Sequence, residues 1–262
     1  MTSTKASRSE IETRLSELAP WHFKIELLPG VWTQNYNRND YSDPDQRSVG
    51  IIDPAEMSGL MDVVLPGGMK DKAFLDVGCN GGGYCFLAHE KGAKECRGFD
   101  IRQHWIDQCE FIMSVKYPEC RSVHFHVADA KTFAHKSAYD VTLFKGVLYH
   151  LPDPMSTLNR LCALTVRAII VDTVCRSDIP EDTLVPWWES KTHVMSGIDG
   201  LAWFPGGPKV VQAILSWSGF PHMRTVNWRK GTPDQRHRGR MRVVAFRHET
   251  DLEAYDASRK PR

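Results

Sequence analysis

The chain has 262 residues, of which 42% are hydrophobic and 25% charged, as in an ordinary globular protein. Its 33 basic and 32 acidic side chains give a formal net charge of +1, so no overall field would attract nucleic acid or an anionic membrane. No apolar run approaches the roughly 20 residues of a membrane span, and residues 1–10 lack the apolar segment of a secretory signal. The seven cysteines form no Cys-x-x-Cys pair, which disfavours a zinc site or a disulfide framework. We therefore expect a cytoplasmic protein with reduced cysteines, no metal site and no membrane partner.

Residues 1–70 are expected to form a helical cap and substrate lid. Apolar side chains at helical spacing predict a helix over 8–18. A second helix is predicted over 53–65, because Asp53 suits the N-cap and Pro54 suits the first helical position.

From residue 73 onward, strand-like apolar runs alternate with helical patterns. Strands are predicted over 73–78, 96–101, 123–129, 139–146 and 167–174. Helices are predicted over 84–90, around the apolar side chains of Trp105 to Met113, and over 154–166. This alternation indicates an α/β fold, a parallel sheet with helices on both faces.

The part of the chain after the fifth strand is less regular. An irregular Trp-rich stretch is expected over 186–207, followed by a helix over 209–218 that places Trp217 in the core. Two β-like runs, 223–228 and 241–246, are expected to pair antiparallel at the edge of the sheet. The main domain would then span 71–248, and the polar tail 249–262 is expected to be frayed.

Asp76 lies close to the end of the first strand, where the glycine-rich turn Gly78-Cys79-Asn80-Gly81-Gly82 begins. Doubly wound sheets bind ligands outside the carboxyl ends of their strands, and glycines let a ligand approach the backbone closely. An acid at Asp76 suits a cation or an amino group better than a pyrophosphate. Asn80 replaces the middle glycine of the dinucleotide pattern G-x-G-x-x-G, which disfavours an NAD-dependent dehydrogenase.

Further acids follow at the ends of the next strands. Asp100 ends the second strand, where a carboxylate can accept hydrogen bonds from both hydroxyls of a ribose. Asp129 ends the third strand and could hold an adenine amino group, with Ala130 beside the ring. Each acid alone could be a turn residue, but three acids at successive strand ends beside a glycine-rich turn are far more specific.

These features resemble the class I S-adenosylmethionine-dependent methyltransferases. DVGCNGG (76–82) resembles the D-x-G-x-G-x-G loop of that superfamily, with Asn80 departing from the second glycine. Other segments resemble the tRNA wobble-uridine carboxymethyltransferase-like group of the 5-oxyacetyluridine pathway: Pro20-Trp21, GVLYH (146–150), WFPGGPKVVQAILSWSGF (203–220) and TPDQR (232–236).

The resemblance implies a Rossmann-like, doubly wound sheet of seven strands and S-adenosyl-L-methionine as cofactor. Together with the strand-end argument, it gives the expected cofactor-binding residues as Asp76, Gly78, Cys79, Asn80, Gly82, Asp100, Ile101, Asp129, Ala130 and Lys145. Lys24 and Arg240 or Arg242 would match the cations with which that group recognises a carboxylated cofactor. They join Trp203 as the expected substrate-binding residues.

Methyl transfer is an in-line displacement, so the protein mainly has to align the nucleophile, the carbon and the sulfur. The resemblance implies that Tyr149 faces the transferred group, and we expect it to orient the acceptor. His150 is the candidate base for a hydroxyl acceptor, whereas an amine needs only to be neutral. A histidine that only packs, with its nitrogens satisfied, is the alternative.

Two further features bear on the acceptor. The segment after the fifth strand, in which this fold commonly carries a substrate lid, contains four large aromatic residues: Trp187, Trp188, Trp203 and Phe204. They would either contact the acceptor or pack the core of a cap. Residues 224–242 hold six Arg and one Lys against one Asp, which suits phosphates or a carboxylated acceptor, or only a solvated loop.

The leading hypothesis is methyl transfer to an O or N of a small-molecule acceptor. A tRNA-modifying (carboxy)methyltransferase ranks second, and a catalytically silent S-adenosylmethionine-binding module third. The sequence predicts a monomer or a homodimer, and it leaves open the acceptor, the choice of O or N and whether the cofactor is carboxylated.

Overall fold

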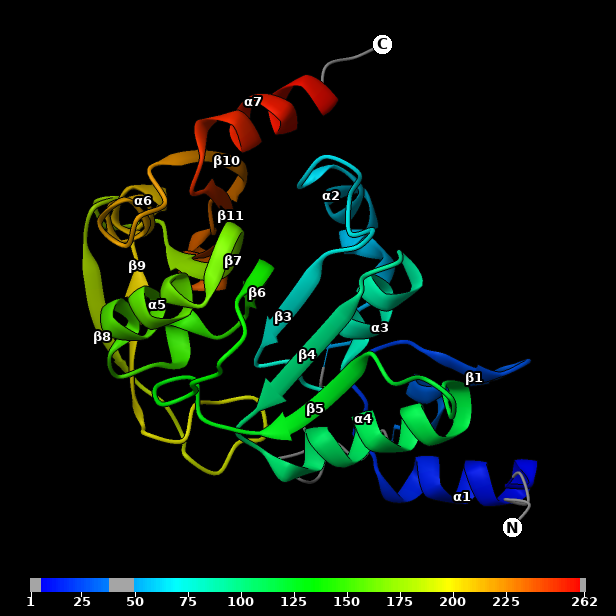
Figure 1. Ribbon diagram of the computed structural model, residues 1–262. Coiled ribbons are helices and arrows are strands. Elements are labelled where there is room, and N and C mark those ends of the chain that lie inside the picture. Colours follow the sequence, from blue (N-terminus) through cyan, green and yellow to red (C-terminus); the bar gives the residue numbers. More distant parts are fainter. Residues whose placement is uncertain (1–5, 38–49, 260–262) are drawn as a thin grey trace.

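A seven-stranded sheet forms the centre of the protein, for which a computed structural model describes residues 6–37 and 50–259 (Figure 1). The strand order is β10-β11-β7-β6-β3-β4-β5. The strands from β3 to β7 are parallel to their neighbours, whereas β11 pairs antiparallel with both β7 and β10. The predicted doubly wound sheet is therefore confirmed, including the antiparallel pair at its edge.

The sheet consists of β3 (Ala73–Val77), β4 (Glu95–Asp100), β5 (Val123–Val127), β6 (Tyr139–Lys145), β7 (Thr165–Arg176), β10 (His222–Arg229) and β11 (Arg238–Phe246). The strand order reverses between β3 and β6, because β4 lies on one side of β3 and β6 on the other. Loops diverge at such a switch point and leave a crevice at the carboxyl ends of the strands.

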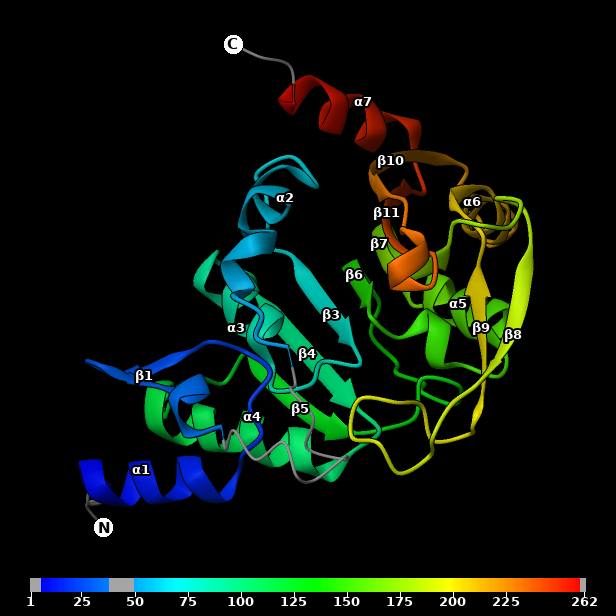
Figure 2. The same cartoon turned by 180° about the vertical axis from the view of Figure 1, so that it is seen from behind.

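Helices cover both faces of the sheet (Figures 1 and 2). They are α3 (Gly83–Glu90) and α4 (Gln103–Lys116) on one face, α5 (Pro154–Ala163) and α6 (Pro208–Trp217) on the other, and α7 (Glu249–Ser258) against β11. Successive strand residues alternate between the two faces, so Phe74 packs into the core with α3 and Leu75 into the core with α5 and α6. These buried faces fix the strand ends that carry the polar residues.

The N-terminal segment packs beside α3 and α4. It comprises α1 (Arg8–Glu17), the short strands β1 (Glu26–Leu28) and β2 (Val31–Trp32), a 3-10 turn at Pro54–Met57 and α2 (Ser58–Val63). The buried Gln108 of α4 donates through Nε2 to the carbonyls of Leu18 (2.7 Å) and Pro20 (2.8 Å). Phe23 lies so close to α3 that a Cβ on Gly83 would come within 2.5 Å of its ring. The N-terminal segment is therefore packed against α3 and α4. That residues 1–70 form a separate cap stays a prediction.

The structure corrects the expected irregular stretch over 186–207. The strands β8 (Leu184–Trp188) and β9 (Leu201–Pro205) form an antiparallel pair there. Ala202 and Phe204 are buried and alternate with more accessible neighbours, which is the period of a strand. Prolines within both segments concealed that pattern, because proline argues against a strand interior.

Trp217 was expected in the core and is instead 69% exposed. The apolar face of α6 consists of Val211, Ile214 and Leu215, and Trp217 at the end of the helix lies off that face. No helix in the described ranges is long and apolar enough to cross a membrane.

The tail 249–262 was expected to be frayed, which is wrong for Glu249–Ser258, because these residues form α7, and residues 260–262 lie outside the described residues. Tyr255 is 1% exposed and packs on Phe246, with 5.3 Å between ring centroids. The buried Asp251 accepts a hydrogen bond from Arg167 Nε of β7 at 3.2 Å. The helix is held by few apolar residues, so its amino-acid composition is mainly polar. For this reason the sequence did not predict a packed helix.

Replacing Tyr255 with alanine is expected to lower the free energy of unfolding by about 3 kcal/mol, because it removes a buried aromatic ring and leaves a cavity. Glu253 is exposed on the same helix, and Glu253→Ala should change that free energy by less than about 0.5 kcal/mol. Urea unfolding measures both values. Equal, small effects would mean that α7 does not pack as described.

Candidate functional site

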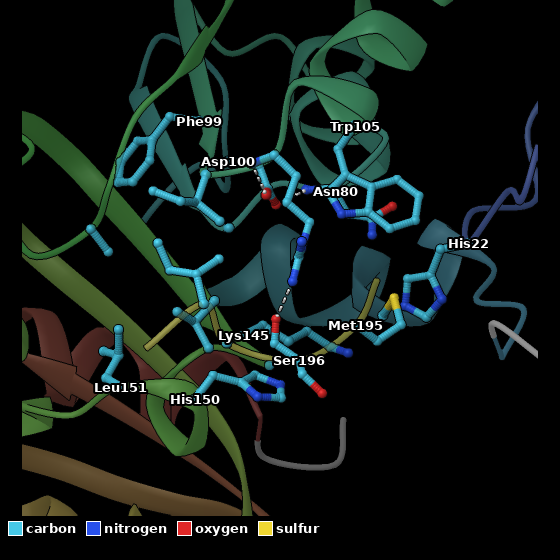
Figure 3. Close-up of a pocket in the computed structure, with 18 of the residues that line it drawn as sticks. His22, Asn80, Phe99, Asp100, Trp105, Lys145, His150, Leu151, Met195 and Ser196 are labelled. Atoms are coloured by element: carbon cyan, nitrogen blue, oxygen red, sulfur yellow. Dashed lines mark hydrogen bonds between the residues drawn. The ribbon is translucent and has the colours of Figure 1, made fainter. Parts of the chain in front are cut away.

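A cavity of about 310 Å³ lies at the carboxyl ends of β3, β4 and β6, at the switch point of the sheet (Figure 3). Its floor comes from the loops after these strands and after β5. Its walls come from His22, Phe23 and Ile52 of the N-terminal segment and from residues 194–199 of the β8–β9 connection. These six segments, which are distant from one another in sequence, therefore meet at one place.

The glycine-rich turn after β3 has the backbone that the sequence predicts. Gly78 has φ +69°, and a Cβ there would lie 2.3 Å from Val147 Cγ2. Asn80 also has a positive φ of 48°, a conformation that asparagine tolerates better than most residues. Gly82 lies at the N-cap of α3, and a Cβ on it would meet the ring of Phe125 at 2.7 Å. The turn thus brings backbone, rather than side chains, to the edge of the cavity.

Asp76 is a buried carboxyl group that faces this cavity. Its side chain is 2% exposed, and within the described part of the chain its Oδ2 has no hydrogen-bond partner. Burial, reinforced by the nearby Asp100, raises the pKa of Asp76 from 3.8 to about 8, although Lys145 opposes the shift. A buried polar atom without a partner is costly. This group therefore suits a cationic ligand that would both pair with it and stabilise its charge.

Asp100 is held in place by the backbone. Its Oδ2 accepts from the N–H of Asn80 at 3.0 Å, and its Oδ1 accepts from the N–H of Arg102 at 3.1 Å (Figure 3). Burial raises its pKa despite these bonds. Each oxygen of a carboxylate has two lone pairs, so both oxygens can still accept from a ligand.

Asp129 at the end of β5 has a similar arrangement. Its Oδ1 accepts from the N–H of Lys131 at 2.9 Å, and the Lys131 ammonium lies 3.4 Å from Oδ2. The three predicted acids therefore line one cavity, together with Ile101 and Ala130.

Basic and aromatic groups form the other end of the cavity. Lys145 Nζ lies 3.1 Å from Glu56 Oε1, which also accepts from the hydroxyl of Tyr84 at 2.6 Å. Burial, together with the neighbouring Arg240, lowers the pKa of Lys145. Arg240 Nε donates to Asp172 Oδ1 at 2.6 Å. This end thus carries two cations that are each paired with one carboxylate.

Tyr149 and His150 lie beside these cations. Burial raises the pKa of Tyr149, with the Arg240 guanidinium acting against the shift. The ring of Tyr149 stacks on Phe204 of β9, with 5.7 Å between centroids. His150 Nδ1 lies 2.9 and 2.8 Å from the two carboxylate oxygens of Glu189.

The connection between β8 and β9 is fastened to the loops that carry the acids. Arg102 donates to the carbonyls of His193 (3.0 Å) and Ser196 (2.8 Å), and Lys131 Nζ contacts both oxygens of Asp199 at 2.7 and 2.6 Å. Figure 2 shows this yellow loop beside the tips of β4 and β5. Residues 189–200, called the lid below, therefore cover one side of the cavity.

The structure brings most of the predicted site residues together. The cavity is lined by Asp76, Gly78, Asn80, Asp100, Ile101, Asp129, Ala130, Lys145, Tyr149, His150 and Arg240. The five other predicted residues lie outside the lining. Cys79 is buried beneath the turn, Gly82 caps α3, and the Lys24 ammonium is 3.6 Å from the Asp53 carboxylate. Trp203 Nε1 donates to the Pro152 carbonyl at 3.0 Å, and Arg242 Nε donates to Asp172 at 2.6 Å.

Sequence reasoning missed several lining residues and their partners. They are His22, Phe23, Ile52, Tyr84, Arg102, Trp105 and the lid residues 194–199, with Glu56, Asp172 and Glu189 just behind them. Asp172 and Arg242 are directly opposite each other in the β7–β11 register, so strand pairing was the one signal that could have located Asp172. Tyr84 and Trp105 lie in the first turns of α3 and α4, and most of the others come from loops, where no periodicity predicts which side chain points inward.

The pH dependence of stability is expected to report the buried Asp76. The unfolded chain ionises this group near pH 3.8 and the folded protein near pH 8, so between these values the folded state holds a proton that the unfolded state has lost. Its contribution to the free energy of unfolding is therefore full below about pH 4, and it falls by about 1.4 kcal/mol per pH unit as the pH rises toward 8. Urea unfolding between pH 5 and 8 should show a steeper decline for the wild type than for Asp76→Asn. Parallel curves would contradict the assigned pKa.

Known proteins share this architecture and parts of this sequence. Residues 69–197 match the family described as "Methyltransferase domain". A tRNA U34 carboxymethyltransferase of Helicobacter pylori is 29% identical over 204 residues, which cover 72% of this chain and 74% of the relative. The corresponding protein of Aliarcobacter butzleri is 33% identical over 120 residues, covering 45% of this chain and only 39% of the relative.

Solved structures extend the likeness to nearly the whole fold. The N-terminal domain of EvdMO1 with SAH bound matches with a TM-score of 0.74 and 20% identity over 94% of this chain and 99% of that domain. Magnesium protoporphyrin IX methyltransferase (ChlM) from Synechocystis PCC 6803 with bound SAM matches with a TM-score of 0.53 and 15% identity over 74% and 78% of the two chains. Residues 69–197 therefore match a methyltransferase domain, and the fold of the chain is that of the class I S-adenosylmethionine-dependent methyltransferases.

Proposed function

We propose that the cavity binds S-adenosylmethionine and that the enzyme transfers its methyl group to a small-molecule acceptor. In this proposal Asp76 holds the cofactor's amino group, Asp100 its ribose hydroxyls and Asp129 its adenine amino group, with Ala130 beside the ring. The buried Oδ2 of Asp76, unpartnered among the described residues, is the observation that carries the proposal. The cofactor would supply an electrophilic methyl carbon, activated by the sulfonium. The residues of this chain then have to hold the acceptor in line with it.

The acceptor is placed at the end of the cavity formed by Lys145, Tyr149, His150 and Arg240. The N-terminal segment and the lid enclose this end from two sides. The cavity volume of about 310 Å³ lies at the lower end of the range of small-molecule pockets. This enclosure favours a small acceptor over a folded nucleic acid.

A tRNA acceptor remains the second candidate, because the relatives from Helicobacter and Aliarcobacter are tRNA U34 carboxymethyltransferases. The basic stretch 224–242 gives it limited support. Arg224, Arg240 and Arg242 are paired with carboxylates. Four other basic residues near the β10–β11 turn make no ion pair within the described ranges, namely Arg229, Lys230, Arg236 and Arg238. A gel shift with tRNA whose affinity falls steeply with salt would favour this second candidate.

Asp100→Ala is expected to weaken binding of S-adenosylhomocysteine by about 1–3 kcal/mol, because it leaves the ribose hydroxyls without their acceptor. Isothermal titration calorimetry measures the change, and a urea unfolding curve of the variant confirms that it is folded. Asp182→Ala, which removes an exposed carboxylate outside the cavity, is the control and should leave the affinity unchanged. An unchanged affinity in Asp100→Ala would refute the proposed ribose contact.

Tyr149→Phe is expected to slow methyl transfer about tenfold or more while leaving the affinity for S-adenosylhomocysteine nearly unchanged. The hydroxyl next to Arg240 would act on the acceptor and the transferred group rather than on the rest of the cofactor. Transfer is measured with radiolabelled S-adenosylmethionine and a metabolite extract. Equal losses of transfer and affinity would argue for a role in cofactor binding alone.

A further inference from the structure

The lid places a carboxylate just behind the acceptor end of the cavity. Glu189 follows β8 directly, and both of its oxygens lie within 2.9 Å of His150 Nδ1. The two side chains are 39 residues apart in sequence and are both largely buried, with 10% of the Glu189 side chain exposed. This pair belongs to neither the acids at the strand ends nor the cations beside Tyr149.

Glu189 is itself fixed by backbone contacts. Its Oε2 accepts from the N–H of Gly197 at 2.9 Å, and its own N–H donates to the carbonyl of Gly200 at 2.8 Å. Gly197 packs so tightly on His150 that a Cβ there would lie 2.4 Å from the His150 carbonyl oxygen. The carboxylate therefore has one defined position, and it can hold the imidazole in one orientation.

The charge of Glu189 is retained in this setting. Burial alone would raise its pKa, but the hydrogen bond and charge of His150, the N–H of Gly197 and the charge of Arg238 together bring that pKa below its ordinary value. An ionised carboxylate is a pure acceptor, so the proton of a neutral imidazole stays on Nδ1. The lone pair is then on Nε2, for which no hydrogen-bond partner occurs within residues 6–37 and 50–259.

The ring nitrogen of His150 that Glu189 leaves free is thus able to act as a base. His150 lines the acceptor end, and Figure 3 shows it beside Ser196 of the lid and across the cavity from Asp100 and Asn80. A carboxylate on Nδ1 that orients the ring and stabilises its protonated form is the arrangement by which enzymes make histidine an effective general base.

We propose that Glu189 is a positioning residue that sets His150 as a general base, and that the acceptor is therefore an alcohol or a phenol. This proposal rests on the proposed function. The acceptor's O–H bond breaks and its proton passes to His150 Nε2. The freed electron pair on oxygen forms the new bond to the methyl carbon, while the electrons of the carbon–sulfur bond stay on sulfur. A neutral amine would need no such base before it attacks.

The first test reads the state of His150 directly, in the full-length protein saturated with S-adenosylhomocysteine. Long-range ¹H–¹⁵N spectra of ¹⁵N-histidine-labelled protein distinguish the two imidazole tautomers. The chain has 11 histidines, so the His150 signals are identified by their loss in His150→Gln. The wild type should show a protonated Nδ1 and a free Nε2, and Glu189→Ala should lose this fixed tautomer. Identical spectra for the wild type and Glu189→Ala would overturn the positioning role.

The second test shows whether the methyl group is transferred to oxygen or to nitrogen, and it does not require the acceptor to be known. Wild-type enzyme, ¹³C-methyl S-adenosylmethionine and a metabolite extract are incubated together, and the carbon chemical shift of the labelled product separates methoxy from N-methyl groups. A methoxy product is expected. Glu189→Ala should form this product about a hundredfold more slowly than the wild type. The rate of Glu189→Gln should fall less, because glutamine keeps an acceptor for Nδ1. Both variants should bind S-adenosylhomocysteine with an affinity within twofold of the wild type.

Glu253→Gln is the matched control, because this exposed glutamate of α7 lies outside the cavity, and its rate should equal that of the wild type. An N-methyl product, or an unchanged rate in Glu189→Ala, would overturn the inference while leaving the proposed function intact. Absence of any labelled product with the wild type would instead overturn the proposed function, and the hydroxyl acceptor with it.

Discussion

A carboxyl group that is buried at the end of a strand without a partner destabilises a folded protein, and the architecture of this site follows from that constraint. The parallel strands β3 and β4 end side by side, and their register brings the end of each strand to the same edge of the sheet. Asp76 and Asp100 are therefore close enough to raise the pKa of Asp76. Without a ligand, the buried Asp76 lowers the stability of the fold. A cationic ligand that pairs with Asp76 would restore this stability.

The lid is connected to the same strand ends, which links cofactor binding to the assembly of the acceptor site. Arg102 follows the end of β4 by two residues and holds the lid through two carbonyls. Lys131 lies two residues after Asp129 and bridges it to Asp199 of the lid. The lid in turn places Glu189 on His150. In this arrangement, the loops that would contact the nucleoside also hold the segment that positions the proposed base.

The sequence was sufficient to predict the sheet and the acids, because both depend on local patterns. Short apolar runs that end in Asp76, Asp100 and Asp129 identify strands and their carboxyl ends together, and the glycines after Asp76 identify the turn. The acceptor end depends on contacts between distant segments instead. Lys24 is a cation in the segment that supplies His22 and Phe23, yet it lies next to Asp53 rather than in the cavity. Arg240 and Arg242, two residues apart, lie on the same face of β11 and both contact Asp172. Of these two, only Arg240 lines the cavity.

A crystal structure of the protein with S-adenosylhomocysteine is the most direct measurement of whether the strand-end carboxylates form the cofactor site. The account predicts that the amino group of the ligand lies within hydrogen-bond distance of Asp76 and that its ribose hydroxyls contact Asp100 beneath the lid. A ligand bound away from the ends of β3 and β4, with Asp76 still unpartnered, would contradict it.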